Sequence, residues 1–94
     1  MGAGAARTTP ERKNAVKYLI MEDFSGRPAV FIFPRRVDHL DMREQLPYKK
    51  ALSAGYVELL DGAPRCFGGH AEMDLHARRQ DADLIRDSLR QRES

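Results

Sequence analysis

The chain has few of the residues that would stabilise it covalently or carry it across a membrane. It contains one cysteine, Cys66, and no tryptophan among its 94 residues. A single cysteine excludes an internal disulfide, and it fits either a reducing compartment or a chain that is indifferent to redox conditions. We interpret Cys66 as a small buried hydrophobe rather than a nucleophile. No apolar run approaches the ~20 residues that a membrane-spanning helix needs, and the first residues lack the apolar segment of a secretion signal. We therefore expect a cytoplasmic protein without a membrane partner.

Most of the chain also lacks an excess of charge of either sign. Residues 1–14 hold three basic residues and one acidic residue, Glu11, so this segment has a net charge of +2. The formal net charge of the whole chain is also +2. The remaining 80 residues therefore hold 13 basic and 13 acidic residues. This balance argues against a strong phosphate-binding surface unless the charges are segregated by sign. Because residues 1–14 have no apolar face to bury, we predict a disordered tail before a single domain over residues 15–92.

Two hairpins are predicted by the apolar segments. The runs VKYLIM (16–21) and PAVFIF (28–33) are separated by turn residues, which is typical of two antiparallel strands. The second of these strands is apolar on both faces, so we expect it to be central or covered. A strand over 51–60, the turn dipeptide Asp61-Gly62 and a return strand from Pro64 indicate the second hairpin.

Side-chain alternation assigns faces within the second hairpin. Leu52, Ala54 and Tyr56 should share one face of its first strand, and Ala51, Ser53, Gly55, Val57 and Leu59 the other. The return strand places Cys66 and Phe67 on opposite faces. Pro64 cannot donate to a neighbouring strand, so we expect its N–H side to face outwards or to lie at the turn.

Two helices are also predicted. Asp38 is spaced as an N-cap, Val37 and Met42 as a hydrophobic staple, and the segment should end by Leu46 because Pro47 follows. The last helix begins near Asp81, and Ala82, Ile85 and Leu89 fall on one of its faces. Residues 68–75 contain Gly-Gly and are expected to bulge before further strand or coil. The order β-β-α-β-β-(β)-α indicates an α+β fold with about four to five antiparallel strands.

The residues that suggest chemistry do not form a recognisable catalytic motif. In a regular strand, Cys66, His70, Asp74 and His76 would share a face, and such side chains bind zinc, but their spacing is not that of a usual zinc site. Gly68-Gly69 also interrupts the alternation. A Cys66 nucleophile with His39 or His70 as base is allowed by residue type alone. The acidic pairs Asp41/Glu44 and Asp81/Asp83 are better interpreted as helix-entry charges. We therefore predict no catalytic residue, metal or cofactor, with the zinc-like set as the weaker alternative.

Basic side chains occur as three pairs at the ends of elements. We interpret them as solvated loop charges. If folding gathers them, they would bind phosphates, with Tyr48 or Tyr56 available for stacking on bases. The residues are Arg35, Arg36, Lys49, Lys50, Arg78 and Arg79.

Several segments resemble a family of small, uncharacterised bacterial and phage-type proteins. The resemblance covers roughly residues 16–90. It rests on KYLIM (17–21), Phe33-Pro34, Asp38-His39, SAGYV (53–57), CFG (66–68) and residues 77–85. At the last helix the chain departs from the family pattern, since Ala77, Arg79 and Gln80 replace Ser, Pro and Glu. The resemblance implies an α+β fold and a cytoplasmic or phage-related origin, and it brings no activity.

These observations favour a non-enzymatic protein-interaction or regulatory module with an unidentified protein partner. The alternatives are a nucleic-acid-binding accessory protein that uses the dibasic pairs, and a small metal-binding protein that uses Cys66, His70 and His76. Edge strands allow either a monomer or a homodimer.

Overall fold

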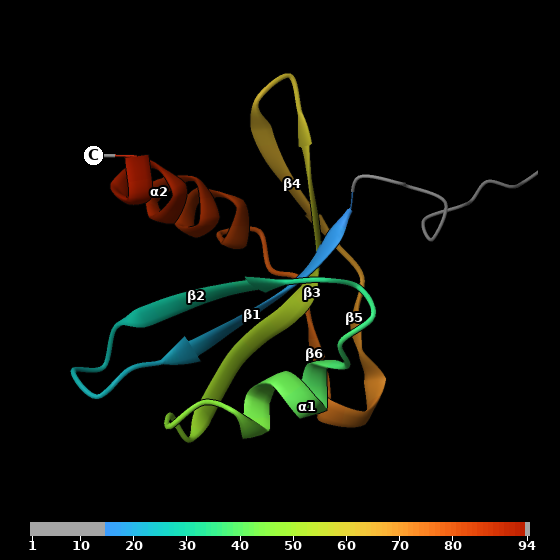
Figure 1. Cartoon of the computed structure of the whole chain (residues 1–94), viewed down its shortest axis with the longest axis vertical. Helices are drawn as coiled ribbons and strands as arrows, with labels where there is room; N and C mark the ends of the chain where they lie inside the picture. The colour runs from blue at the N-terminus through green and yellow to red at the C-terminus, as the bar shows by residue number, and fades with distance from the viewer. Residues whose placement is uncertain (1–14, 94) are drawn as a thin grey trace, which may run out of the picture.

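The four longest predicted strands form one antiparallel sheet. The computed structural model describes residues 15–93 (Figure 1), so the predicted tail lies outside the described residues. The strands lie in the order β2-β1-β3-β4, which makes β2 and β4 the edges. Their bounds are β1 Val16–Glu22, β2 Pro28–Phe33, β3 Lys50–Leu60 and β4 Ala63–Phe67.

The remaining elements confirm the predicted order and the α+β class. Helix α1 spans His39–Glu44 and helix α2 spans Asp81–Glu93. Between β4 and α2, the strands β5 (Gly69–His70) and β6 (Leu75–His76) form a separate two-stranded sheet, joined by the short 3₁₀ helix η3 (Ala71–Met73). The segment after Gly68 is therefore a small ribbon rather than a continuation of β4.

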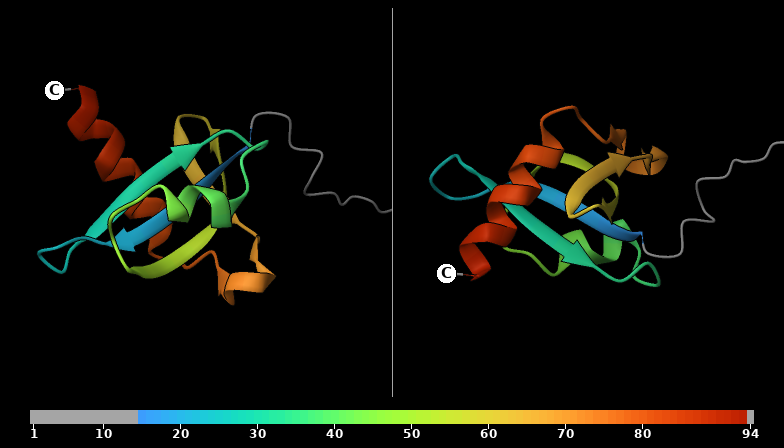
Figure 2. Two further views of the ribbon diagram at one scale, coloured as in Figure 1. Left: turned by 60° about the horizontal axis from the view of Figure 1, so that its bottom comes forward. Right: turned by 90° about the horizontal axis from the view of Figure 1, so that it is seen from above.

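The two helices cover opposite faces of the large sheet (Figures 1 and 2). Successive residues of β1 point to opposite faces, so both faces of this strand are buried. On one face, Tyr18 and Ile20 pack with Ile85 of α2; on the other, Leu19 and Met21 pack with side chains that include Met42 of α1. We call these the α2 face and the α1 face. Two apolar layers thus share one sheet, which explains why β1 and β2 lack the alternation of a half-exposed strand.

The turns follow the predicted chemistry. In the β1–β2 turn, the Asp23 carboxylate accepts hydrogen bonds from the backbone N–H groups of Ser25 and Arg27 at 2.9 Å, and Gly26 has a φ of 87°. In the β3–β4 turn, Asp61 and Gly62 have φ values of 53° and 80°, as a two-residue hairpin turn of this type requires.

The predicted faces of β3 are wrong at its start. Ile20 pairs with Ser53, but Met21 pairs with Ala51, so Leu52 is an extra residue in β3. Because this bulge shifts the alternation, Leu52 packs on the α2 face and Ala51 on the α1 face, opposite to their expected sides. The later part follows the prediction: Ala54 and Val57 lie on opposite faces.

Helix α1 begins as predicted and ends earlier. The Asp38 carboxylate accepts a hydrogen bond from Leu40 N–H at 2.9 Å, which confirms the N-cap. The helix ends at Glu44 instead of Leu46, because the N–H groups of Gln45 and Leu46 bond to carbonyls three residues back. Such bonds tighten the last turn into 3₁₀ geometry. In the described part of the chain, neither helix is long and apolar enough to cross a membrane.

Candidate functional site

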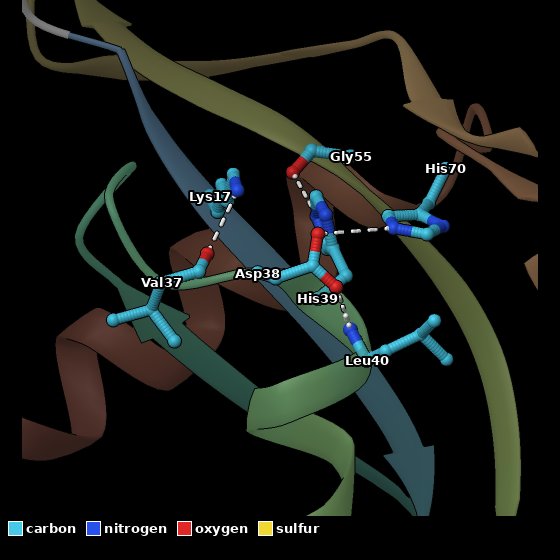
Figure 3. A network of polar contacts seen from close by, with 7 residues as sticks. All are labelled: Lys17, Val37, Asp38, His39, Leu40, Gly55 and His70. Carbon is cyan, nitrogen blue, oxygen red and sulfur yellow. Dashed lines mark hydrogen bonds and ion pairs between the residues drawn. The ribbon is translucent and has the colours of Figure 1, made fainter. Parts of the chain in front are cut away.

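Asp38, His39 and His70 form a polar cluster on the α1 face, at the start of α1 (Figure 3). His39 is 1% exposed, and its Nε2 lies 3.0 Å from the carbonyl oxygen of Gly55 in β3. A carbonyl only accepts hydrogen bonds, so Nε2 carries the proton and donates. Burial lowers the pKa of His39, and the ring is therefore held neutral near pH 7.

His70 approaches the same ring from β5. The His39 and His70 ring centroids are 5.2 Å apart in an edge-on arrangement. The Nε2 of His70 lies 3.4 Å from Asp38 Oδ1, which is a long contact, and its Nδ1 is buried without a hydrogen-bond partner among residues 15–93. The other carboxylate oxygen of Asp38 accepts a hydrogen bond from Leu40 N–H. This hydrogen bond is the largest cause that lowers the pKa of Asp38, and the contact with His70 lowers it further. Asp38 is therefore a charged cap that also orients His70.

Aromatic rings close the cluster. His39 lies edge-on to Phe33 at 5.4 Å and to Tyr56 at 5.9 Å between centroids. Tyr56 in turn stacks on Phe67 at 5.6 Å, which also places Phe67 on the opposite face from Cys66, as predicted. The cluster joins α1 to the main sheet and to β5.

The chemistry open to this cluster is limited by where its nitrogens point. A general base must reach the proton that it removes. The whole His39 ring is buried with Nε2 on Gly55, while Nε2 of His70 faces Asp38 and Nδ1 of His70 is enclosed. The arrangement is that of a buried polar junction between elements, in which Nδ1 of His70 has no partner among the described residues.

A second buried network occupies the α2 face. Asp81, the first residue of α2, is fully buried, and its Oδ2 accepts from the Tyr18 hydroxyl at 2.6 Å and from Arg78 N–H at 2.8 Å. Its Oδ1 accepts from Arg78 Nε at 2.9 Å. Burial and the hydrogen bond to Asp81 raise the pKa of Tyr18, so this phenol keeps its proton. The network ties the start of α2 to the centre of the sheet.

Cys66 lies beside Tyr18 and away from both candidate bases. Burial raises the pKa of the Cys66 thiol to about 11, so the thiol is protonated at neutral pH. His39 and His70 lie on the α1 face, whereas Cys66 packs on the α2 face. The structure therefore does not bring together the predicted Cys66 nucleophile and either histidine.

The zinc-like set is also separated. Gly68 has a φ of 74° and Asp74 a φ of 56°, and these left-handed residues break the alternation that would have aligned the four side chains. Cys66 and His70 lie on opposite faces, and Asp74 and His76 are exposed. In the described range 15–93, no three His, Cys, Asp or Glu side chains lie close enough to hold a metal ion.

The three dibasic pairs do not gather into one patch. Arg35 and Arg36 follow Phe33, whose partner in the sheet is Lys17, near the start of β1. Lys50 lies at the other end of β1, where its Nζ is 3.7 Å from Glu22 Oε1. Those ends of β1 are separated by ~17 Å. The pair Lys49 and Lys50 lies beside an aromatic side chain, as the sequence had suggested for Tyr48. The two lysines line a hollow of about 390 Å³ together with Glu22, Asp23, Phe24 and Tyr48.

The third pair and the second tyrosine have other contacts. Arg78 is bonded to the buried Asp81, while Arg79 is exposed. Tyr56 packs against His39 and Phe67 instead of presenting a free stacking surface.

Sequence reasoning missed the burial of His39 and Asp81, although each had a signal. His39 precedes Met42 by three residues and Leu46 by seven, which is the spacing of one helical face. Asp81 precedes Ile85 by four residues and therefore shares its buried side.

Comparisons of the chain with family models, with curated proteins and with solved structures find no match.

Proposed function

We propose that the protein is a non-enzymatic protein-interaction module that binds an extended protein segment along the free edge of β2. The observation that carries the proposal is the composition and position of this strand. Every residue of β2, Pro28–Phe33, is apolar, and no other described strand pairs with its outer side. Edge strands are often protected from pairing with other chains by charged side chains or by proline. Strand β2 has no charge, and its one proline, Pro28, is its first residue.

The outward backbone groups of β2 follow from its register with β1. Asp23 N–H donates to the carbonyl of Arg27 at 2.8 Å, so these two residues form a hydrogen-bonded pair. Such pairs alternate along antiparallel strands, and Ala29, Phe31 and Phe33 therefore bond to β1. The N–H and C=O groups of Val30 and Ile32 consequently point away from the sheet.

The side chains of β2 support recognition through the backbone. Phe33 is buried, and Val30, Phe31 and Ile32 are half-buried within the two apolar layers. The expectation that this strand is covered on both faces is confirmed, although it is an edge strand. A ligand would add a strand to the sheet, as in β-strand addition, where main-chain hydrogen bonds supply much of the affinity.

The enclosed histidines favour a binding role over catalysis. Nε2 of His39 bonds to the carbonyl of Gly55, Nε2 of His70 contacts Asp38, and Cys66 is a protonated thiol beside Tyr18. Each of these groups contributes to holding a helix or ribbon on the sheet.

The test uses two substitutions at one outward position. Val30→Pro removes the outward N–H, and proline is tolerated on the free side of an edge strand. Val30→Ala keeps the N–H and removes comparable packing. The full chain and both variants, checked for folding by circular dichroism, are used to capture and identify proteins from the native host. Binding that the alanine variant keeps and the proline variant loses is expected; a set of bound proteins that is the same for all three would refute the proposal.

A further inference from the structure

We infer, resting on the proposed function, that the strand that pairs with β2 is the β2 of a second copy of this chain. The two strands run antiparallel about a two-fold axis at Phe31, and the two large sheets become one continuous sheet. Most soluble homo-oligomers have such closed symmetry, in which one surface meets its own image.

The backbone of β2 is complementary to itself in this register. With the axis at Phe31, Val30 faces Ile32 of the second copy. Both N–H groups and both carbonyls of these two residues then form hydrogen bonds across the interface. The outward backbone groups at the centre of the edge are thus all paired.

The prolines at the two ends agree with the same register. The next pair outward joins Pro28 of one copy to Pro34 of the other. Pro28 has no N–H, and the carbonyl of Pro34 already accepts from Val37 N–H at 3.1 Å. Pro34 also has no N–H, so the carbonyl of Pro28 gains no partner in the second copy. Pro28 is exposed at the end of the strand, where water can bond to this carbonyl, and the pairing ends there without an unpaired N–H.

Other symmetric registers leave backbone groups unpaired at the half-buried Val30 or Ile32, instead of at the exposed Pro28. With the axis at Val30, the Ile32 carbonyl faces Pro28, which has no N–H to donate. With the axis at Ile32, the Val30 carbonyl faces Pro34, which also lacks an N–H, and the Val30 N–H faces a carbonyl that is bonded to Val37. Buried backbone groups without partners are costly, so the axis at Phe31 is favoured.

Helix α2 packs on one face of the sheet, so it lies outside the plane in which the two β2 strands would pair. Figure 2 shows α2 crossing β2 on one face and ending beyond the free edge. The crossing lies near the start of β2, since a hollow between the two elements is lined by Arg27, Pro28, Val30, Leu84, Asp87 and Gln91. The two-fold operation places the two crossings at opposite ends of the paired strands. Each helix then extends over the second copy and adds contact area to a short strand pairing.

A disulfide tests the register directly. In the proposed arrangement Phe31 faces Phe31 of the second copy as a non-hydrogen-bonded pair, with Cα atoms about 4.5 Å apart, which is within disulfide range. The full chain with Cys66→Ser and Phe31→Cys is expected to form a covalent dimer under mild oxidation. Ala29→Cys in the same background is the matched control, because its two copies would be ~13 Å apart. Cross-linking of the control in preference to Phe31→Cys would overturn the inference.

Sedimentation of chains that keep Phe31 provides the second measurement. The unsubstituted chain and Val30→Ala are expected to dimerise as concentration rises, and Val30→Pro to remain monomeric. A monomeric unsubstituted chain at every concentration would overturn the inference. If such a monomer still captured another protein through the Val30 N–H, the proposed function would stand without self-pairing. If neither dimerisation nor capture depended on that N–H, both would fall.

Discussion

Removing the Tyr18 hydroxyl with the variant Tyr18→Phe should lower the free energy of unfolding, because it removes a buried hydrogen bond to Asp81. Tyr18 and Asp81 are both fully buried, and the phenol donates to the carboxylate at 2.6 Å. In Tyr18→Phe, Oδ2 of Asp81 keeps only the bond from Arg78 N–H. Hydrogen bonds to charged groups contribute about 1.5–3 kcal/mol, so we expect the free energy of unfolding to fall by about 2 kcal/mol.

That loss is large for a domain of this size. Total stability is typically about 5–15 kcal/mol, and 1 kcal/mol shifts Tm by about 4–8 °C in domains of 60–100 residues. Urea denaturation followed by circular dichroism measures the free energy, and a thermal scan measures Tm. Because the Tyr18 phenol keeps its proton, the loss should be the same at pH 6.5 and pH 8.5.

Two controls separate this hydrogen bond from ring packing. Tyr48→Phe keeps the ring that lies 4.9 Å from Phe24 and 6.0 Å from Phe31, and it should change stability little. Combining Tyr18→Phe with Asp81→Asn should give a loss smaller than the sum of the two single losses, because both changes remove one interaction. Additive losses, or a Tyr18→Phe effect below about 0.5 kcal/mol, would refute the reasoning.

Two further predictions concern ionisation. Burial lowers the pKa of His39 in the folded chain below the value of 6.5 that the residue has when unfolded. At acidic pH the unfolded chain therefore binds more protons than the folded chain, so the free energy of unfolding should fall as the pH drops from about 7.5 to about 5.5. His39→Gln should flatten this fall in a pH series of urea denaturations while the exposed His76→Gln does not, and an unchanged slope in His39→Gln would contradict the assignment. The thiol of Cys66 should react with a disulfide reagent about a hundredfold more slowly at pH 8 in the folded chain than in urea, because its pKa is raised from 9.0 to about 11. Equal rates in the two states, measured by absorbance, would show that the thiol is not enclosed beside Tyr18.

Local patterns were sufficient for most of the elements. The run PAVFIF predicted β2 residue for residue, Asp38 predicted the start of α1, and Asp61-Gly62 predicted the turn between β3 and β4. Each of these signals depends on neighbours a few residues away, through φ preferences, capping or side-chain periodicity.

The candidate site was less predictable because it joins distant segments. Asp38 and His39 were each noticed in the sequence, but the edge-on contact with His70 requires β5 to fold back over the start of α1. Likewise, Asp81 was interpreted as a helix-entry charge, and only its bond to Tyr18, 63 residues away, makes it a buried junction. The metal hypothesis required unbroken alternation from Cys66 to His76, which the left-handed Gly68 and η3 interrupt.

The sequence by itself determined the class of the fold, the order of its elements and the absence of an internal disulfide. The tertiary structure decided the strand order, the bulge that exchanges the faces of Ala51 and Leu52, and the position of β2 at an edge. The physical reason is that periodicity reports how a segment is covered, whereas the neighbour that covers it is selected by contacts across the whole chain. An apolar strand with both faces covered looks the same in sequence whether it is central or at an edge. At an edge, however, its outward N–H and C=O groups are open to another strand.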